Sequence, residues 1–201
     1  MPDDLVVHVV EDDLAMRDAL LLLLQSEGLP ARGYASAEEF LAKQDCRQPP
    51  CLLVDIRLPG VNGLALQREL VSRGADPAIV MITGHGDIPL AVAAVKAGAL
   101  DFVTKPFDPA ALLQSVHAAR QRTLENRQRV AAGAEIDACL QSLTPREASI
   151  LTLLTEGHSN KIIAAELGIS LRTVEHHRAH IMEKMHARTI AQLIRAVLGR
   201  S

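Results

Sequence analysis

The chain has 201 residues, of which 48% are hydrophobic and 22% charged, with a formal net charge of −3, and this fits a globular protein of two unequal domains. No apolar run approaches the roughly 20 residues that span a bilayer, and the start, Met-Pro-Asp-Asp, is acidic, unlike a signal peptide. We therefore expect a cytoplasmic protein that is not inserted in a membrane. Three widely spaced cysteines, Cys46, Cys51 and Cys139, form no Cys-x-x-Cys pair and argue against a disulfide framework or a zinc site.

Short apolar runs alternate with helical patterns through residues 1–120. The apolar runs are residues 5–10, 30–34, 51–54, 78–82 and 101–103. The helical patterns are residues 13–27, 36–43, 63–73 and 87–97, and a fifth begins at Asp108. Five strand-helix units in succession predict an α/β fold with a doubly wound, five-stranded parallel sheet. The first, third and fourth runs are almost wholly apolar, which indicates strands that helices cover on both faces.

A helical linker is expected at residues 121–141, between a first domain at residues 1–120 and a second at residues 142–201. The linker is polar, rich in Arg and Gln and made of good helix formers, with Gly133 as its single glycine. Charge differs along the chain: residues 1–120 carry 10 Lys and Arg against 16 Asp and Glu, whereas residues 121–201 carry 11 against 8. The basic part predicts contact with a polyanion.

The second domain is predicted to hold four short helices and no strand. Thr144 and Glu147 form a capping box at the start of the first, with Pro at the first helical position. Ser159 and Ser170 are expected to cap the second and third helices, and a fourth closes the domain. The tight connection that starts at Gly168, between the second and third helices, predicts a helix-turn-helix.

The ends of the predicted strands carry polar residues suited to one site. Glu11 and Asp12 follow the first strand, Asp55 the third, Thr83 the fourth and Lys105 the fifth. Because parallel strands end at one edge of a sheet, these side chains should converge. Three close carboxylates need a counter-cation, and oxygen ligands favour Mg²⁺ or Mn²⁺ over zinc. With Lys105 and Thr83, such a site could bind a phosphoryl group and stabilise an aspartyl-phosphate at Asp55.

Other interpretations of these residues stay open. Asp55 could merely cap a loop and form an ordinary surface ion pair with Lys105. It could also be the nucleophile of a Mg²⁺-dependent phosphatase or hydrolase, although Arg57 stands where the second acid of the usual Asp-x-Asp pair would be. A further alternative is a constitutive DNA-binding protein whose first domain senses a ligand or partner without phosphorylation.

Four segments resemble the signatures of bacterial response-regulator receiver domains: VVEDDLAMRD, LLVDIRLPGVNG, MITGHGD and AGALDFVTKPF. Residues 142–196 resemble the LuxR-type helix-turn-helix, and the pairing is similar to the NarL/FixJ class of two-component transcription factors. The resemblance covers nearly the whole chain. It implies a flavodoxin-like receiver domain that is phosphorylated by a sensor histidine kinase, forms a homodimer and binds promoter DNA, with RNA polymerase as a further partner. It implies no enzymatic activity beyond slow self-dephosphorylation.

The resemblance also assigns roles at the acidic residues. Asp55 would be the phospho-acceptor, and Lys105 would bind the phosphoryl group. Asp12, Asp55 and the backbone carbonyl of Arg57 would ligate Mg²⁺. Glu11 stands where the family often has Asp and would act through water. The peptide bond between Lys105 and Pro106 is expected to be cis.

A switch is implied by two further residues. Thr83 would engage the phosphoryl group, and Phe102 would be the aromatic side chain that then moves inward, although Phe102 could also be a plain core residue. Phosphorylation would thereby remodel the face made by the fourth helix, fifth strand and fifth helix, and favour a dimer. Arg57 and His85 lie near the path of a hydrolytic water and would tune the lifetime of the phosphate, with His85 equally explained as a loop residue.

The third helix of the second domain, residues 171–185, would be the recognition helix. Glu175, His176 and Ala179 should face the base edges, where Glu175 can accept a hydrogen bond from a cytosine amino group. Basic or hydrogen-bonding residues should contact phosphates: Lys161, Arg172, Thr173, His177, Arg178 and Lys184. The buried side should hold Val174, Ile181 and Met185, packed against Ile162, Ile163 and Leu167.

Two features of the second domain bear on its ligands. The histidines His176, His177 and His180 could share a metal ion, but Glu183 is the single further ligand in reach, so zinc is not favoured and a plain solvated helix face explains them as well. A net charge of only about +3 predicts weak DNA binding by one copy. Dimerisation on two half-sites would supply the missing affinity.

Overall fold

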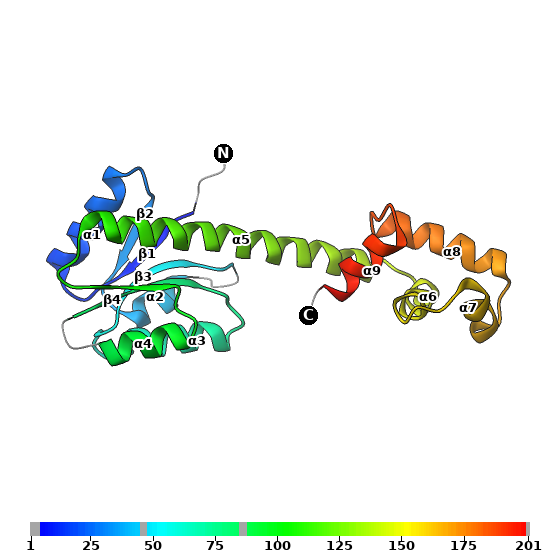
Figure 1. The fold of residues 1–201 in the computed structure, drawn as a ribbon, viewed down its shortest axis with the longest axis horizontal. Helices are drawn as coiled ribbons and strands as arrows, with labels where there is room; N and C mark the ends of the chain where they lie inside the picture. The colour runs from blue at the N-terminus through cyan, green and yellow to red at the C-terminus, as the bar shows by residue number, and fades with distance from the viewer. Residues whose placement is uncertain (1–4, 45–47, 85–87, 200–201) are drawn as a thin grey trace. The chain divides into compact units, whose positions relative to one another are not determined.

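The protein is described by a computed structural model that covers residues 5–44, 48–84 and 88–199 (Figure 1). The chain divides into two compact units, a first unit of Met1–Gln128 and a second unit of Arg129–Ser201. Each unit has its own hydrophobic core. In the part of the chain that is described, no helix combines the length and the apolarity that crossing a bilayer requires.

The first unit is built on a five-stranded sheet in which every pairing is parallel. The spatial order is β2-β1-β3-β4-β5. The strands are β1 Val7–Val10, β2 Ala31–Tyr34, β3 Cys51–Asp55, β4 Ala78–Thr83 and β5 Asp101–Thr104. The helices are α1 Leu14–Ser26, α2 Ala37–Lys43, α3 Gly63–Ser72, α4 Ile88–Lys96 and α5 Pro109–Gln141. The predicted doubly wound, parallel α/β fold is confirmed.

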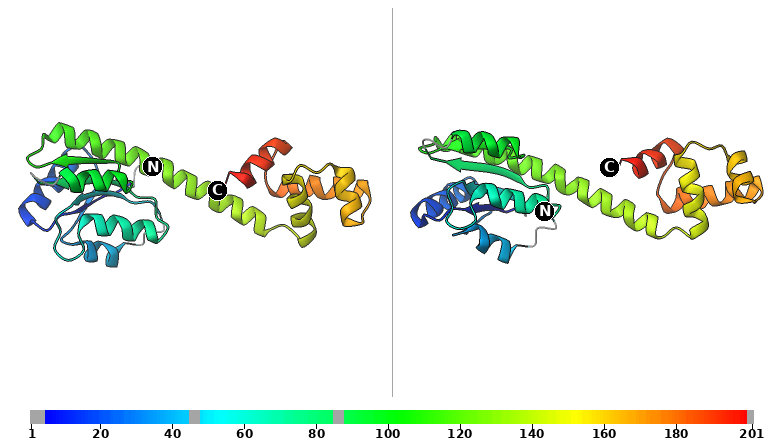
Figure 2. Two further views of the ribbon diagram at one scale, coloured as in Figure 1. Left: turned by 60° about the horizontal axis from the view of Figure 1, so that its bottom comes forward. Right: turned by 90° about the horizontal axis from the view of Figure 1, so that it is seen from below.

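Helices cover both faces of this sheet, α1 and α5 on one and α2, α3 and α4 on the other (Figures 1 and 2). Alternate residues of a strand therefore enter different cores: Val9 and Leu53 pack on one face, and Val10 and Leu52 on the other. Each such buried side chain stabilises the fold by roughly 1.5–3 kcal/mol relative to an exposed one. This explains why the central strands are almost wholly apolar, as the sequence indicated.

The middle of α5 is attached to the first unit by polar side chains. Arg120 Nη1 donates to the carbonyl of Leu5 over 2.7 Å, Asn126 Nδ2 to that of Asp76 over 2.9 Å, and Arg127 Nε to that of Pro49 over 3.0 Å. These carbonyls lie just before β1, β4 and β3. Residues 121–128, part of the expected linker, therefore pack on the first unit.

The second unit contains the end of α5 and four further helices: α6 Pro145–Thr155, α7 Asn160–Leu167, α8 Leu171–Lys184 and α9 Ile190–Leu198. Thr144 and Glu147 form the expected capping box, and Gly168 ends α7 at a φ of 64°, in the left-handed region that favours glycine. Ile150, Ile163 and Leu193 lie in its core. The predicted four helices are confirmed.

One residue predicted for the second core, Ile162, lies on the surface instead. Ile162 was expected to pack in the second core, but it is 51% exposed, whereas its neighbour Ile163 is fully buried. The prediction for Ile162 is wrong because successive residues of an α-helix point roughly 100° apart, and on α7 it is Ile163 that points into the core. Cys51 and Cys139 are free thiols, and Cys46 lies outside the described residues.

Candidate functional site

Three carboxylates meet at the carboxyl edge of the sheet in the first unit. Glu11 directly follows β1, Asp12 comes next, and Asp55 ends β3. One oxygen atom from each lies within 4.8 Å of the others. Glu11 and Asp55 are buried, with 1% and 7% exposure, whereas Asp12 is exposed. The parallel register of β1 and β3 brings these residues together, and we call them, with Lys105, the acidic site.

Lys105 provides the counter-charge within the acidic site. Its Nζ donates to Asp55 Oδ2 over 2.6 Å and to Glu11 Oε2 over 2.8 Å. The backbone holds the lysine there, because Lys105 N donates to the Thr83 carbonyl over 2.7 Å. The Lys105–Pro106 bond is cis, as expected. Burial opposes charge on Lys105, but its hydrogen bonds to Asp55 and Glu11 raise the pKa of its ammonium.

The surroundings of Glu11 change the pKa of its carboxyl group. Burial raises its pKa, the hydrogen bond from Lys105 lowers it, and the charge of Asp55 raises it further, with a net upward shift. A divalent cation would favour the ionised form. The donor set fits Mg²⁺ or Mn²⁺, because three carboxylates, which are hard oxygen ligands, converge there, and Lys105 pairs with two of them, Glu11 and Asp55.

The residues around Asp55 are placed by the loops that follow the strands. Arg57 N donates to Asp55 Oδ1 over 2.7 Å, so backbone and Lys105 each hold one carboxylate oxygen. Thr83 ends β4, is fully buried, and its Oγ1 donates to the Gly84 carbonyl over 3.1 Å. His85 lies outside the described residues. The structure thus brings the Arg57 backbone and the Lys105 side chain each into contact with Asp55.

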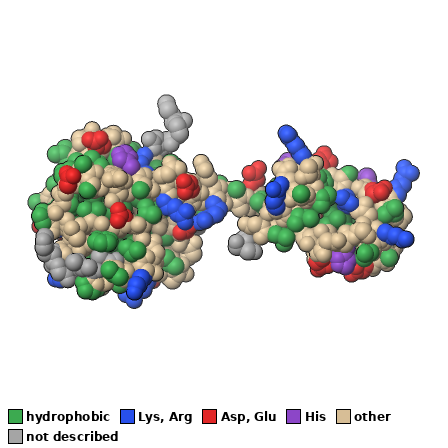
Figure 3. Space-filling view, viewed as in Figure 1, with side chains coloured by type: hydrophobic (Ala, Val, Ile, Leu, Met, Phe, Trp, Pro, Cys, Tyr) green, Lys and Arg blue, Asp and Glu red, His purple; other side chains and the backbone are tan. Residues whose placement is uncertain are grey.

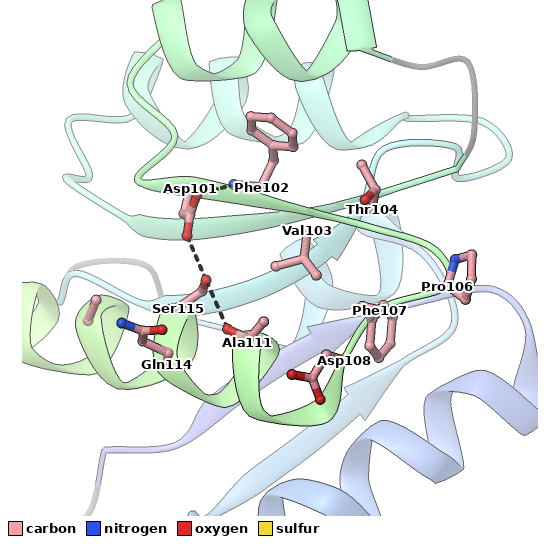
Figure 4. A pocket seen from close by; sticks show the side chains of 11 residues that line it. Asp101, Phe102, Val103, Thr104, Pro106, Phe107, Asp108, Ala111, Gln114 and Ser115 are labelled. Carbon is pink, nitrogen blue, oxygen red and sulfur yellow. Dashed lines mark hydrogen bonds between the residues drawn. The ribbon is translucent and has the colours of Figure 1, made fainter.

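A groove of about 590 Å³ lies beside β5 and the start of α5 (Figure 4). Ser115 Oγ donates to Asp101 Oδ2 over 2.6 Å, and Asp101 Oδ1 accepts from Phe102 N over 2.8 Å. In Figure 4, Phe102 and Val103 point to opposite faces of the strand. Phe102 is partly buried and packs against the core under α2, α3 and α4, so it is in part the core aromatic that the sequence offered as an alternative.

Arg17 is a residue near the acidic site that the sequence analysis missed. It lies on α1, and its Nη1 donates to the backbone carbonyl of Glu11 over 2.7 Å and to that of Asp12 over 3.3 Å. Its position four residues after Asp13, the N-cap of α1, was a signal that it could reach back to this loop.

In the second unit, the residues expected to read bases lie on the surface of α8. Glu175, His176 and Ala179 are exposed, and Val174 and Ile181 on the opposite side are fully buried. Figure 3 shows basic side chains spread over this unit among acidic ones, in keeping with a small net positive charge. Among the expected phosphate contacts, Lys161 and Arg172 are exposed and Thr173 and His177 half-buried.

Two of the expected phosphate contacts have partners inside the unit. Lys184 Nζ donates to Glu147 Oε2 over 2.7 Å and to the Ser142 carbonyl over 3.1 Å. Arg178 Nη1 donates to Asn160 Oδ1, which joins α8 to the start of α7. The pKa of Glu147 is lowered to about 2, first by the hydrogen bond from Lys184 and then by the hydrogen bond from the backbone N–H of Thr144. Both side chains therefore help to hold this unit together, and their contact with phosphates stays a prediction.

The histidines of α8, His176, His177 and His180, lie near one another on the helix. The ring centroids of His176 and His180 are 4.2 Å apart. Within residues 5–44, 48–84 and 88–199, the acidic cluster of Glu11, Asp12 and Asp55 is the single group whose ligand atoms are close enough to hold a metal ion. The geometry gives no support to zinc at the histidines.

Comparisons with known families and proteins agree on both units. Residues 7–117 match the family described as the response regulator receiver domain, and residues 141–197 match the bacterial regulatory proteins of the luxR family. The transcriptional regulatory protein FixJ of Azorhizobium caulinodans is 44% identical over 198 residues, which cover 98% of this chain and 94% of that protein. Nodulation protein W of Bradyrhizobium diazoefficiens is 43% identical over 190 residues, which cover 94% of this chain and 84% of that protein.

Solved structures give the same result. The response regulator StyR superposes with a TM-score of 0.82 and 40% identity, covering 96% of this chain and 98% of that one. Full-length FixJ from B. japonicum superposes with a TM-score of 0.60 and 36% identity, covering 98% of each chain. The likeness therefore extends over both units.

Proposed function

Since the chain belongs to the two-component response regulators that join a receiver domain to a LuxR-type DNA-binding domain, we propose that it is switched by phosphorylation of Asp55. Its relatives are regulators of transcription, a family of proteins that are not enzymes. The phosphoryl donor would be a sensor histidine kinase. The observation that carries the proposal is the buried Asp55 carboxylate, held by Lys105 Nζ and Arg57 N beside Glu11 and Asp12.

The proposed transfer moves a phosphoryl group from a kinase histidine to Asp55. A carboxylate oxygen of Asp55 attacks phosphorus, the bond from phosphorus to the histidine nitrogen breaks, and the released imidazole keeps the electron pair of that bond and takes a proton from water. Mg²⁺ would be held by Asp12, Asp55 and the Arg57 carbonyl, with Glu11 acting through water. The charge of the metal ion would neutralise the phosphoryl oxygens. Lys105 already lies against Asp55 and would bind one of those oxygens as it arrives.

The proposed switch runs from Thr83 to the face around β5. Thr83 Oγ1 donates to the Gly84 carbonyl, and a phosphoryl group at Asp55 would offer it a stronger, charged acceptor. Phe102, on the neighbouring strand, would then move inward. The groove beside β5 and α5 borders Phe102, so this movement would reshape a surface at which a homodimer forms. Arg57, and His85 beyond the described residues, would tune how long the phosphate lasts.

The proposed output is promoter binding by α8 in the second domain. Glu175, His176 and Ala179 would face base edges, and Lys161, Arg172, Thr173 and His177 would contact phosphates. Two copies on two half-sites would supply affinity that one weakly basic domain lacks. We place this activity in the cytoplasm, where promoter DNA, the kinase domain and RNA polymerase, a further partner, are available.

Incubation with Mg²⁺ and acetyl phosphate tests this function. We expect the intact protein to gain the mass of one phosphoryl group, in a linkage that is stable to acid and labile to base, and the Asp55→Asn variant to gain none. As the wild type gains phosphate, its affinity for promoter DNA and its fraction of dimer should both rise, and neither should rise in Asp55→Asn. Steady turnover of the phosphodonor would instead indicate a phosphatase, and DNA binding without any phosphate gain would indicate a constitutive DNA-binding protein.

A further inference from the structure

The loop between β1 and α1 carries two of the three carboxylates of the acidic site, and Arg17 contacts it from outside the site. Arg17 Nη1 donates to the Glu11 carbonyl over 2.7 Å and to the Asp12 carbonyl over 3.3 Å. On its other side, Glu11 N donates to the Tyr34 carbonyl of β2 over 3.1 Å. Both polar groups of the Glu11 backbone therefore have fixed partners.

Gly33 on β2 makes room for the Arg17 side chain. A Cβ atom at Gly33 would lie 3.0 Å from Arg17 Cδ and 3.1 Å from Cγ, closer than ordinary van der Waals contact. The stem of Arg17 thus crosses the strand over a position without a side chain. This close approach fixes the path of the stem, and hence where the guanidinium ends.

We propose that Arg17 is a positioning residue for the metal site, a role that rests on the proposed function of that site. By holding two successive carbonyl groups, it fixes the peptide planes from which the side chains of Glu11 and Asp12 project. A guanidinium suits this task because its planar donors can serve neighbouring acceptors while it keeps its charge. Arg17 itself contacts neither the metal nor the phosphoryl group in this role.

The sign of the effect separates positioning from simple electrostatics. If Arg17 acted only as a nearby positive charge, its removal would strengthen binding of a cation. If it positions the carboxylates, its removal weakens binding, and changes to groups that orient metal ligands typically cost 10- to 100-fold in affinity. The two roles therefore predict opposite changes in one measurement.

Mn²⁺ titration of the full chain, followed by the electron paramagnetic resonance signal of free Mn²⁺, tests the proposal. We expect roughly 10- to 100-fold weaker binding in Arg17→Ala and partial recovery in Arg17→Lys, which keeps the charge and one donor. Arg73→Ala is the matched control, because it removes an exposed arginine just after α3 that pairs with Glu69, and it should bind Mn²⁺ like the wild type. Equal or tighter binding in Arg17→Ala would overturn the proposal.

A second variant covers the case in which Arg17→Ala does not fold. Arg17→Met keeps a stem that can cross Gly33 and removes the donors, so weaker Mn²⁺ binding is expected, and unchanged binding would contradict the proposal. Acetyl phosphate labelling of the wild type separates the two hypotheses. If the wild type binds Mn²⁺ but gains no phosphoryl group, the proposed function is wrong, and the comparison of Arg17 variants still decides the positioning role. If the wild type binds no Mn²⁺, both the proposed function and the positioning role are overturned.

Discussion

Lys105 and Asp55, 50 residues apart in the sequence, are joined by a hydrogen bond of 2.6 Å between Nζ and Oδ2. The same ammonium lies 2.8 Å from Glu11 Oε2. In the resting site Lys105 therefore balances two buried carboxylates. Under the proposed function, a phosphoryl group on Asp55 would present the same ammonium with a greater negative charge, and Lys105 would then stabilise the phosphorylated product.

Replacement of Lys105 by Met should slow phosphorylation of Asp55. The variant keeps the length of the side chain but removes the fixed positive charge, and loss of one such stabilising group costs roughly 10²- to 10³-fold in rate. The rate of mass gain with acetyl phosphate measures this. Lys43→Met, which alters an exposed pair with Glu39 on α2, should label at the wild-type rate. Equal labelling of both variants would remove Lys105 from the mechanism.

Substitutions on the exposed side of α8 should change which DNA sequence is preferred. Glu175→Ala and His176→Ala remove side chains expected at base edges, where one good contact discriminates by roughly 1–3 kcal/mol. Selection from a random DNA pool, followed by affinity measurement on the chosen sites, reports the preference. Glu183→Ala, exposed further along the same helix, should retain the wild-type preference. If Glu175→Ala and His176→Ala both keep the wild-type sequence preference, these residues do not face the base edges.

Lys161→Ala and Lys184→Ala should behave differently, although both remove a lysine expected to contact phosphates. Lys161 is exposed, so its loss should weaken binding to all sequences alike and leave the melting temperature unchanged. Lys184 is bound to the buried Glu147, so its loss should lower the free energy of unfolding by roughly 1–3 kcal/mol. Calorimetry and DNA titration on the same samples measure both effects.

The pH dependence of stability gives a control for Lys184. The pKa of Glu147 is lowered to about 2, chiefly by the hydrogen bond from Lys184. Because the pKa of Glu147 is lower in the folded protein than its ordinary value of 4.5, the ionised carboxylate stabilises the fold fully above pH 4.5. This stability is lost as the pH falls through about 2. The difference between wild type and Lys184→Ala should therefore shrink from pH 4.5 to pH 2. Unchanged melting with weaker DNA binding would restore Lys184 as a phosphate contact.

His8 should make the first domain less stable in mild acid. It is buried on β1, its Nδ1 lies 3.0 Å from the Tyr34 hydroxyl, and its pKa is lowered to about 4, first by burial and then by the charges of Arg32 and Arg127. Because the unfolded chain takes up the proton at the ordinary value of 6.5, the stability from neutral His8 is complete above that pH and is lost as the pH falls through 4. The loss amounts to about 3 kcal/mol at most.

Urea unfolding of wild type and His8→Phe at several pH values isolates this contribution. The variant keeps an aromatic ring beside Phe40 and cannot be protonated, so its stability should depend less on pH between 6.5 and 4. Tyr34→Phe removes the hydrogen bond but leaves His8, and should keep most of the wild-type slope. Identical slopes in wild type and His8→Phe would contradict the prediction.

The acidic site was predictable because it depends on where strands end. Glu11, Asp55 and Lys105 each follow an apolar run, and in a parallel sheet such positions converge whatever the loops do. Arg17 was missed because it acts on backbone carbonyls, which no pattern of side-chain types reveals. The internal partner of Lys184 was missed for a related reason: Glu147 lies on another helix, and helix packing is not encoded in the spacing within one helix.

Hydrophobic periodicity also explains two limits on predicting the fold. It indicated a buried side for α7, but it could not decide between Ile162 and Ile163, of which the second is in the core. It gave no sign that α5 stays packed on the first domain beyond residue 120, because Asn126 and Arg127 make contacts there through polar groups, beside the apolar Leu124. Polar side chains that donate to carbonyls leave no apolar stripe to detect.

The attachment of α5 decides where this protein can be cut and rejoined. A fragment that ends at residue 117, like the matched receiver segment, lacks Arg120, Asn126 and Arg127, and so leaves the carbonyls before β1, β4 and β3 without these donors. A fragment that ends at Gln128 keeps all three. Chimaeras that connect this receiver to a foreign output domain, or its output domain to a foreign receiver, should therefore be joined after Gln128, in the exposed part of the helix.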